Sequence, residues 1–325
     1  MYITVKQLAV VLANSYKGMS RLPGSVESVK FAHLRVEGQS TPRLAVTVNS
    51  GALFLDEVMD DAPTDLQHLI ERGEAGLAHV RAVIDQAIAQ RVSFTPIDEL
   101  RHASAVLRPP HVLAVGANYA AHASELKLRS ESAMTVFSLW PNSLTAHDAT
   151  TTWPGDLTQQ VDYEAELGVI IGKPANNVSV REALDYVWGY TVVNDITARD
   201  LQFSEAQWSR CKSFDGFTPT GPVVVTADEV PDPQDLWLTT NVDGQILQDA
   251  SSGEMVRTVA EIISYLSRSS TIPAGTLIST GSPGGAGYSR SPQVFLTDGA
   301  SVTVAVEGIG ELTTHCRVTG AAPAE

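Results

Sequence analysis

Runs of alternating apolar and polar residues dominate the first hundred positions of the chain. They predict three strands, at residues 29–36, 43–48 and 52–55. Two later segments have the apolar spacing of helices, at residues 65–72 and 77–90. Within the second helix, one apolar stripe is typical of core packing: Val80, Val83, Ile84, Ala87 and Ile88. We therefore expect a small α+β domain over residues 1–106.

A stiff junction follows, because neither proline of Arg108-Pro109-Pro110 can continue a helix. Residues 107–325 consist mainly of short apolar runs, separated by Asp-Gly and Pro-Gly turns. Predicted strands include residues 222–226, 236–242, 276–279 and 301–306. The clearest helix is 256–267, with one apolar stripe of Val259, Ile262, Ile263 and Leu266. Strands and helices do not alternate as in βαβ units, so the predicted fold class is α+β, mainly β.

One apolar run carries three acids. Residues 161–172 have the composition of a strand, and because strand side chains alternate, Asp162, Glu164 and Glu166 point to one face. Their mutual repulsion would be relieved by a hard divalent cation such as Mg²⁺, which prefers carboxylate oxygens. A solvated strand face is the alternative.

A second predicted strand ends in an acid, Asp195, and a helix start follows it. Functional groups are common at such a place, although Asp195 or Thr197 could instead cap the helix. Arg199 and Gln202 are three residues apart and would share a helix face. Lys212 follows in a loop of polar and small residues, where it is either part of a site or an ordinary surface lysine.

A third segment adds acid–base chemistry. The predicted strand 112–116 leads through a loop to a short helix that carries His122 and Glu125. At this spacing the carboxylate can orient the imidazole and raise its basicity, which is the arrangement of a general base. A contact between surface side chains three residues apart is the alternative.

The order of these segments resembles the fumarylacetoacetate hydrolase family over roughly residues 110–316. The motifs that carry the resemblance are, in chain order, Val115-Gly116-Ala117-Asn118-Tyr119-x-x-His122-x-x-Glu125, Tyr163-Glu164-x-Glu166-Leu167, Gly189-Tyr190-Thr191-x-x-Asn194-Asp195-x-x-Ala198-Arg199-Asp200-x-Gln202, Lys212-Ser213-Phe214-Asp215 and Thr280-Gly281-Ser282-Pro283. The resemblance implies a catalytic domain with the family's mixed β-roll, preceded by a small domain, and a homodimer.

The resemblance also assigns roles to residues. It implies that Glu164, Glu166 and Asp195 bind Mg²⁺ or Mn²⁺, and that His122 and Glu125 form a pair on a mobile lid that activates water. Other residues are expected to face the substrate: Tyr119, Arg199, Gln202, Thr280 and Lys212, of which Lys212 would add catalytic positive charge.

Two departures from the family pattern bear on the site. The position of a fourth acidic ligand, seven residues before His122, is Val115, which matches the three-carboxylate type of site. Leu139 stands where the family usually has a lysine near the substrate. An anion beside Leu139 would be desolvated without a partner, so we expect the acyl end of the substrate to be neutral or apolar.

Composition limits the partners. A formal net charge of −15 over 325 residues excludes neither an enzyme nor a small anionic substrate, but it argues against nucleic acid and anionic membranes. No apolar run approaches the length of a spanning helix, and the N-terminus lacks the pattern of a signal peptide. Two cysteines, Cys211 and Cys316, make no disulfide framework, so we expect a cytoplasmic protein.

Three reactions fit these residues. A 2-oxo acid can chelate a divalent cation, which would stabilise negative charge as the neighbouring C–C bond breaks. With water activated by His122, the reaction is hydrolysis of an acylpyruvate, which we expect. Decarboxylation of oxaloacetate and keto–enol or double-bond isomerisation are alternatives on the same site, and an inactive ligand-binding relative is a further one.

Overall fold

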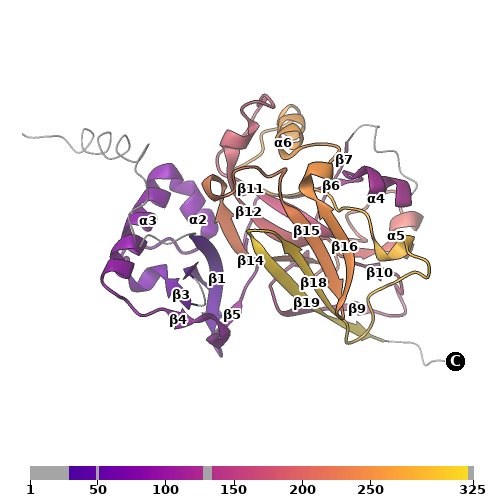
Figure 1. The fold of residues 1–325 in the computed structure, drawn as a ribbon, viewed down its shortest axis with the longest axis horizontal. Coiled ribbons are helices and arrows are strands. Elements are labelled where there is room, and N and C mark those ends of the chain that lie inside the picture. Colours follow the sequence, from indigo (N-terminus) through magenta and orange to yellow (C-terminus); the bar gives the residue numbers. More distant parts are fainter. Residues whose placement is uncertain (1–28, 49–50, 127–133, 321–325) are drawn as a thin grey trace, which may run out of the picture.

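A computed structural model describes residues 29–48, 51–126 and 134–320 (Figure 1). The first 28 residues, which bear on the expectation about a signal peptide, lie outside these ranges. So does the segment 127–133, which follows the helix of the expected lid. Across the described ranges, no helix combines the length and apolar character needed to cross a bilayer.

Twelve strands form the largest sheet. They are, in chain order, β1 (Lys30–Val36), β2 (Arg43–Val48), β3 (Gly51–Phe54), β4 (Thr95–Pro96), β5 (Leu100–His102), β6 (Val112–Gly116), β7 (Thr135–Ser138), β8 (Leu144–Thr145), β11 (Ala165–Ile171), β12 (Val187–Asn194), β14 (Thr218–Thr226) and β17 (Leu277–Ser279). Its main path runs β4-β3-β2-β1-β14-β12-β11-β17-β6-β7, with β5 beside β1 and β8 beside β14. Because β1 pairs with β14, strands from both sides of residue 106 belong to one sheet.

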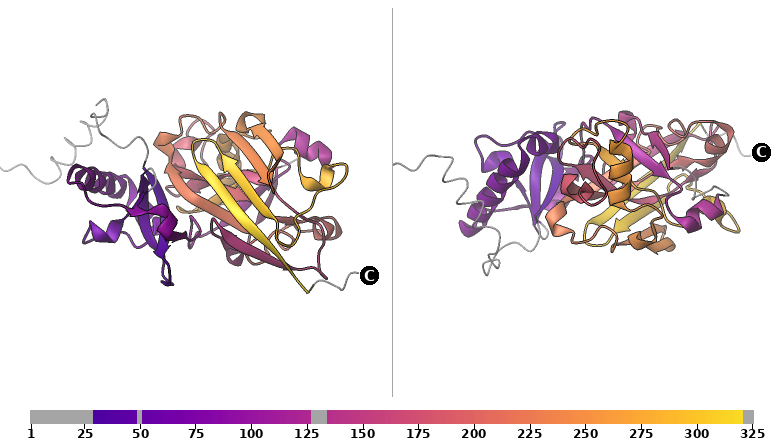
Figure 2. Two further views of the ribbon diagram at one scale, coloured as in Figure 1. Left: turned by 60° about the horizontal axis from the view of Figure 1, so that its bottom comes forward. Right: turned by 90° about the horizontal axis from the view of Figure 1, so that it is seen from above.

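A second sheet has five strands. They are β9 (Ala149–Pro154), β15 (Trp237–Val242), β16 (Gln245–Ser251), β18 (Ser301–Val306) and β19 (Gly310–Thr319). This sheet packs on β11, β12 and β14, and apolar side chains such as Val169, Val302 and Leu312 fill the space between the two. Figure 2 shows that the yellow C-terminal strands lie beside the orange and red strands, away from the indigo ones.

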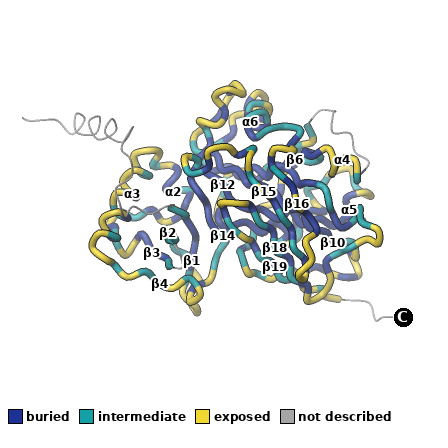
Figure 3. The backbone as a smooth tube through the Cα atoms, viewed as in Figure 1, coloured by how far each residue is buried: buried dark blue, intermediate teal, exposed yellow. Residues whose placement is uncertain are grey.

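Helices cover the sheets from outside. They are α2 (Leu66–Glu71), α3 (Gly73–Ala89), α4 (Ala120–Glu125), α5 (Arg199–Ser204) and α6 (Val259–Ser267). In Figure 3, α3 shows exposed segments along its outer side, whereas β12 is buried throughout. The predicted apolar stripe of α6 is buried, and the helix begins three residues later than predicted. Thr258 and Glu261 form a capping box there, which fixes the first turn. The fold is therefore α+β and mainly β, as predicted.

The acid-bearing run 161–172 differs from the single predicted strand. It divides into β10 (Val161–Asp162), which pairs with β13 (Thr197–Ala198), and β11, which starts at Ala165. At residues 163–165, the backbone N–H groups donate to side chains and not to a neighbouring strand. Tyr163 donates to Asp162 Oδ1, Glu164 to Asn194 Oδ1 and Ala165 to Gln248 Oε1. The ladder is interrupted because these donors are already satisfied.

Candidate active site and metal centre

Three buried carboxylates meet where β11 begins and β12 ends. Glu164 precedes β11, Glu166 is its second residue and Asp195 follows β12. The two strands are antiparallel with Ala165 opposite Asn194, so their register brings the three acids together. Each offers one oxygen atom, and these atoms lie within 4.8 Å of one another. The predicted convergence is present, although Asp162 is not part of it.

Glu166 is oriented by the segment after β17. Its Oε2 atom accepts hydrogen bonds from the Ser279 hydroxyl at 2.5 Å and from the Gly281 backbone N–H at 2.8 Å. Both donors hold the same oxygen, so the carboxylate has a defined orientation. Such outer hydrogen bonds typically fix the ligands of metal sites.

Lys212 is buried at the centre of the cluster and is not a surface lysine. Its ammonium donates to Glu164 Oε2 at 2.7 Å, to Asp195 Oδ2 at 2.6 Å and to Thr197 Oγ1 at 2.7 Å. These three bonds use all three protons of the ammonium group. Burial disfavours the charge, but Asp195 and Glu164 outweigh burial and raise the pKa of Lys212.

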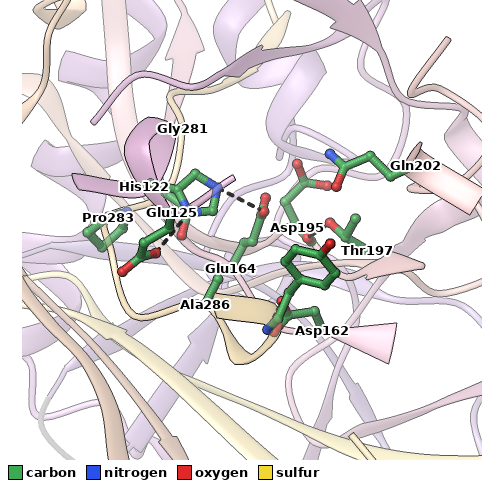
Figure 4. A network of polar contacts seen from close by, with 12 residues as sticks. His122, Glu125, Asp162, Glu164, Asp195, Thr197, Gln202, Gly281, Pro283 and Ala286 are labelled. Carbon is green, nitrogen blue, oxygen red and sulfur yellow. Dashed lines mark hydrogen bonds and ion pairs between the residues drawn. The ribbon is translucent and has the colours of Figure 1, made fainter. Parts of the chain in front are cut away.

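Arg199 is also buried and lies behind the carboxylates. Its Nε atom donates to Asp162 Oδ2 at 2.8 Å, and its Nη2 atom lies 2.7 Å from Glu164 Oε1. Its Nη1 atom donates to the side-chain oxygen of Gln202 at 2.9 Å. Arg199 therefore pairs with protein groups and orients Gln202, whose side chain faces Asp195 (Figure 4).

The cluster holds more negative charge than these cations balance. Burial, together with the charges of Asp195 and Glu164, raises the pKa of Glu166 well above its usual range. Burial also raises the pKa of Asp195 to about 6, against the opposing effect of Lys212. For Glu164, burial is outweighed by the charges of Lys212 and Arg199, which lower the pKa.

A divalent cation fits this imbalance. The Oδ1 atom of Asp195 is buried and has no hydrogen-bond partner among the described residues, which is costly unless a ligand satisfies it. All the available donor atoms of the cluster are carboxylate oxygens, the ligands preferred by Mg²⁺ and Mn²⁺. Glu164, Glu166 and Asp195 can therefore hold such an ion.

His122 lies between two carboxylates. Its Nε2 atom is 3.3 Å from Glu164 Oε1, and its Nδ1 atom is 3.8 Å from Glu125 Oε2 (Figure 4). Burial opposes protonation, but Glu125 and Glu164 outweigh it and raise the pKa of His122. Glu125 itself accepts hydrogen bonds from the Gly285 backbone N–H, at 2.9 and 3.1 Å. The helix of the predicted pair is therefore attached to the loop after β17.

These residues surround a cavity that is partly open to solvent. The polar lining residues are His122, Glu164, Glu166, Asp195, Gln202, Lys212 and Ser282. The remaining lining residues are mainly apolar, and they are Val115, Gly116, Ala117, Leu126, Phe137 and Trp208. The rings of Phe137 and Trp208 meet edge to face with centroids 5.5 Å apart. A Cβ atom at Gly116 would lie 2.3 Å from the Trp208 ring, so glycine there makes room for the indole.

A family model described as the C-terminal part of fumarylacetoacetate hydrolase matches residues 111–317. The chain belongs to this family. An uncharacterized protein of Staphylococcus epidermidis is 41% identical over 225 residues, covering 69% of this chain and 73% of the relative. The solved structure of fumarylacetoacetate hydrolase from Exiguobacterium antarcticum is 34% identical in sequence to this chain, with a TM-score of 0.77. The match covers 90% of this chain and 100% of that one.

A second solved structure is named for a different activity. The 2-hydroxyhepta-2,4-diene-1,7-dioate isomerase from Mycobacterium marinum is 26% identical, with a TM-score of 0.67, over 90% of this chain and 100% of its own. Of these two similar structures, one is therefore named as a hydrolase and the other as an isomerase.

Several of the residues expected to face the substrate lie elsewhere. Leu139 packs in the core with residues such as Val112 and is not among the residues that line the cavity. Thr280 donates its hydroxyl to the Leu167 carbonyl at 2.8 Å, and Tyr119 is a buried core residue. Leu139 therefore does not line the cavity, and the apolar lining comes from other side chains. Val115, at the position of a fourth acid, lines the cavity, so the site has three carboxylates.

Other contributors were missed by sequence reasoning. Asp162, Ser282, Gln248, Phe137 and Trp208 all take part in the site or its support. Asp162 carried a signal, since it is the first of the alternating acids, but its place behind Arg199 depends on the break in the strand. Ser282 belonged to a recognised motif, while an isolated glutamine or tryptophan has no pattern that marks it.

Proposed function

We propose that this chain is a divalent-metal-dependent hydrolase that cleaves a C–C bond in an acylpyruvate-type 2,4-dioxo acid. The observation that carries the proposal is one cavity that holds the carboxylates of Glu164, Glu166 and Asp195 beside His122. When bound, a divalent cation supplies Lewis-acid polarisation of the 2-oxo acid oxygens. Mg²⁺ and Mn²⁺ both suit the carboxylate ligands.

The protein residues supply the proton transfer. His122 lies in the cavity wall, and in its neutral form it can take a proton from water that attacks the distal carbonyl. Glu125 stabilises the imidazolium that results, since Oε2 is 3.8 Å from Nδ1. Lys212 adds fixed positive charge near the polar end of the substrate. The products are pyruvate and the carboxylic acid of the acyl chain.

The shape of the cavity supports a neutral acyl end. In the part of the chain that the structure describes, Lys212 is the one lysine or arginine that lines the cavity, and its protons are already engaged. A second substrate carboxylate placed against Phe137 and Trp208 would lose hydration without a partner. We therefore infer that the substrate carries one carboxylate and an apolar or small acyl group.

An isomerase on the same site is the second candidate, favoured by the similarity to the Mycobacterium marinum isomerase. A panel of acylpyruvates, oxaloacetate and unsaturated 2-oxo diacids, assayed with Mg²⁺, with Mn²⁺ and with EDTA, separates the reactions. Hydrolysis requires the release of pyruvate from an acylpyruvate. Carbon dioxide from oxaloacetate, or double-bond migration without cleavage, would replace hydrolysis as the function.

The homodimer implied by the family resemblance is likewise a proposal. Size-exclusion chromatography with light scattering should give twice the mass of the 34.7 kDa chain. A monomer at micromolar concentration would contradict it.

A further inference from the structure

Gln248 is a buried residue of β16 whose side-chain amide is fully hydrogen-bonded. Its Oε1 atom accepts from the Ala165 backbone N–H at 2.9 Å and from the Thr240 hydroxyl at 2.7 Å. Its Nε2 atom donates to Ser282 Oγ at 2.9 Å and to the Pro283 carbonyl at 2.9 Å. Two accepted and two donated bonds use the main capacity of an amide, so this side chain has one defined orientation.

The partners fix which end of the amide is oxygen. The backbone N–H of Ala165 can only donate and the carbonyl of Pro283 can only accept, so an exchanged amide would meet a like group at both. The polarity of Ser282 follows from this assignment. Its Oγ atom accepts from Gln248, and we find no acceptor for its own proton among the described residues. Since Ser282 lines the cavity, that proton is available to a ligand oxygen.

The other end of the amide holds the metal-binding strand. Ala165 lies between Glu164 and Glu166, at the place where the strand ladder is interrupted. The Gln248 side chain accepts a hydrogen bond from the Ala165 backbone N–H, which has no partner in a neighbouring strand of the described ranges. The Gln248 side chain therefore connects the backbone between the two glutamates to the loop of Ser282, beside the direct hydrogen bond from the Gly281 backbone N–H to Glu166.

The same loop has further attachments on both sides of Ser282, and the Gly281 backbone N–H before it donates to Glu166. Glu125 accepts from Gly285, and Asp162 accepts from the backbone N–H groups of Gly287 and Tyr288. None of these attachments contacts the Ser282 hydroxyl itself, which is bonded to the amide of Gln248. The orientation of the cavity hydroxyl therefore depends on Gln248 more directly than on the backbone attachments.

We propose that Gln248 is a positioning residue that holds the Ser282 hydroxyl in register with Glu164 and Glu166. This inference deepens the proposed function, and it rests on a 2-oxo acid as the ligand of the cavity. Loss of the two donors should displace the hydroxyl, which weakens binding of substrate and leaves the proton transfer at His122 intact. Loss of a hydrogen bond to a charged ligand group typically weakens binding by roughly 10- to 100-fold.

Gln248→Glu tests the donors separately, because the isosteric carboxylate keeps both acceptor bonds and lacks the two N–H groups. Gln248→Met removes the polar contacts without adding charge. Thr240→Val is the structural control, since it deletes one bond of the same network on the side away from the loop. Gln245→Glu places the same charge on an exposed position of the same strand.

The readouts are KM, kcat and thermal unfolding with acetylpyruvate and Mn²⁺, together with calorimetric binding of pyruvate to the Mn²⁺-loaded protein. Both Gln248 variants should raise KM by roughly 10- to 100-fold with kcat changed less than about threefold. Thr240→Val should lower the unfolding temperature yet leave KM unchanged, and Gln245→Glu should resemble wild type.

Equal rises of KM in Thr240→Val and Gln248→Met would overturn the positioning role, because they would reflect general destabilisation. An unchanged KM in a folded Gln248→Glu protein would also overturn it. If wild type hydrolyses no acylpyruvate, the proposed function fails separately. Pyruvate binding then still decides the role of Gln248: the proposal requires weaker binding in Gln248→Met than in Thr240→Val.

Discussion

The ammonium of Lys212 lies 2.6 Å from Asp195 Oδ2, while Oδ1 of the same carboxylate is buried without a partner among the described residues. One oxygen of Asp195 is thus held by the protein, and the other is left for a ligand. Glu166 has the same division, since both of its donors bind Oε2. The protein thus fixes one oxygen of Asp195 and one of Glu166 and leaves the other to a cation, whereas both oxygens of Glu164 face Arg199 or Lys212.

Replacement of Glu166 by alanine should remove an oxygen ligand. We expect Mn²⁺ affinity, measured by calorimetry, to fall on the order of 100-fold or more, since even outer partners of metal ligands change affinity by about 10- to 100-fold. Glu307→Ala, at an exposed turn after β18, is the control and should bind as wild type does. Wild-type affinity in the Glu166 variant would exclude it as a ligand.

Metal removal should destabilise the fold, because the buried carboxylates then repel each other. Addition of Mg²⁺ at about 100 times its Kd should stabilise the protein by about 2.7 kcal/mol, since binding to the native state alone shifts the unfolding equilibrium. Differential scanning fluorimetry with Mg²⁺ and with EDTA measures the shift. The Glu166→Ala protein should show little or none of it, and an equal shift there would place the ion elsewhere.

His122→Ala should slow hydrolysis by roughly 10²- to 10⁴-fold, as expected for loss of a general base. Metal affinity should remain near that of wild type, because the three carboxylates are intact. Steady-state rates and Mn²⁺ calorimetry on the same preparation check both statements. Joint loss of metal and activity would make His122 a ligand, and unchanged hydrolysis would remove it from the mechanism.

Trp208→Ala should change substrate preference through loss of the apolar wall. Burial of a large side chain is worth about 1.5–3 kcal/mol, so kcat/KM for a long acylpyruvate such as hexanoylpyruvate should fall roughly 10- to 100-fold. Acetylpyruvate, which reaches the wall less, should lose far less. Trp237→Ala, an exposed tryptophan on β15, is the matched control. A wild-type enzyme that prefers a dicarboxylic substrate tenfold would contradict the apolar role of this wall.

His33 should make stability depend on pH. Burial lowers its pKa from 6.5 to about 4, against partly opposing contributions from the Ser104 carbonyl and Asp65. Its Nε2 atom accepts from the Leu66 backbone N–H at 3.1 Å, so protonation there would break this bond. The unfolded chain binds the proton more readily, and stability therefore falls as the pH drops from about 6.5 to about 4.

The shift of His33 corresponds to roughly 3 kcal/mol over that interval. Urea unfolding at pH 7 and pH 4.5 measures most of it, and His33→Gln, which cannot titrate, should lose less stability between the two. His102 also has its pKa lowered to about 4, first by burial, so some pH dependence should persist in the variant. Identical losses in wild type and variant would show that His33 is not responsible.

The sequence predicted those parts of the site in which chemically suitable residues form a local pattern. Alternating acids, an acid at a strand end and a His–Glu pair are local features, and the structure brings Glu164, Glu166, Asp195 and His122 to one cavity. Several of the regular elements were also predicted, because apolar periodicity reports burial directly, whereas β9, β16 and β19 of the second sheet were not.

What the sequence could not show depends on long-range packing. Leu139 was placed near the substrate by its position in a motif, yet its side chain points into the core. Trp208 reaches the cavity because Gly116, far away in the chain, leaves space for it. The hydrogen bonds that engage the Lys212 ammonium likewise require acids from two different strands. Such relationships have no local signature.

The pairing of β1 with β14 has a consequence for biosynthesis. Phe31 lies opposite Val224, and nearly two hundred residues separate them in the chain. A fragment that ends at residue 106 should therefore show faster amide hydrogen exchange in β1 than the full chain does. Translation proceeds from the N-terminus, so β1, at residues 30–36, acquires β14 as a neighbour only after residues 218–226 of the 325-residue chain have been made.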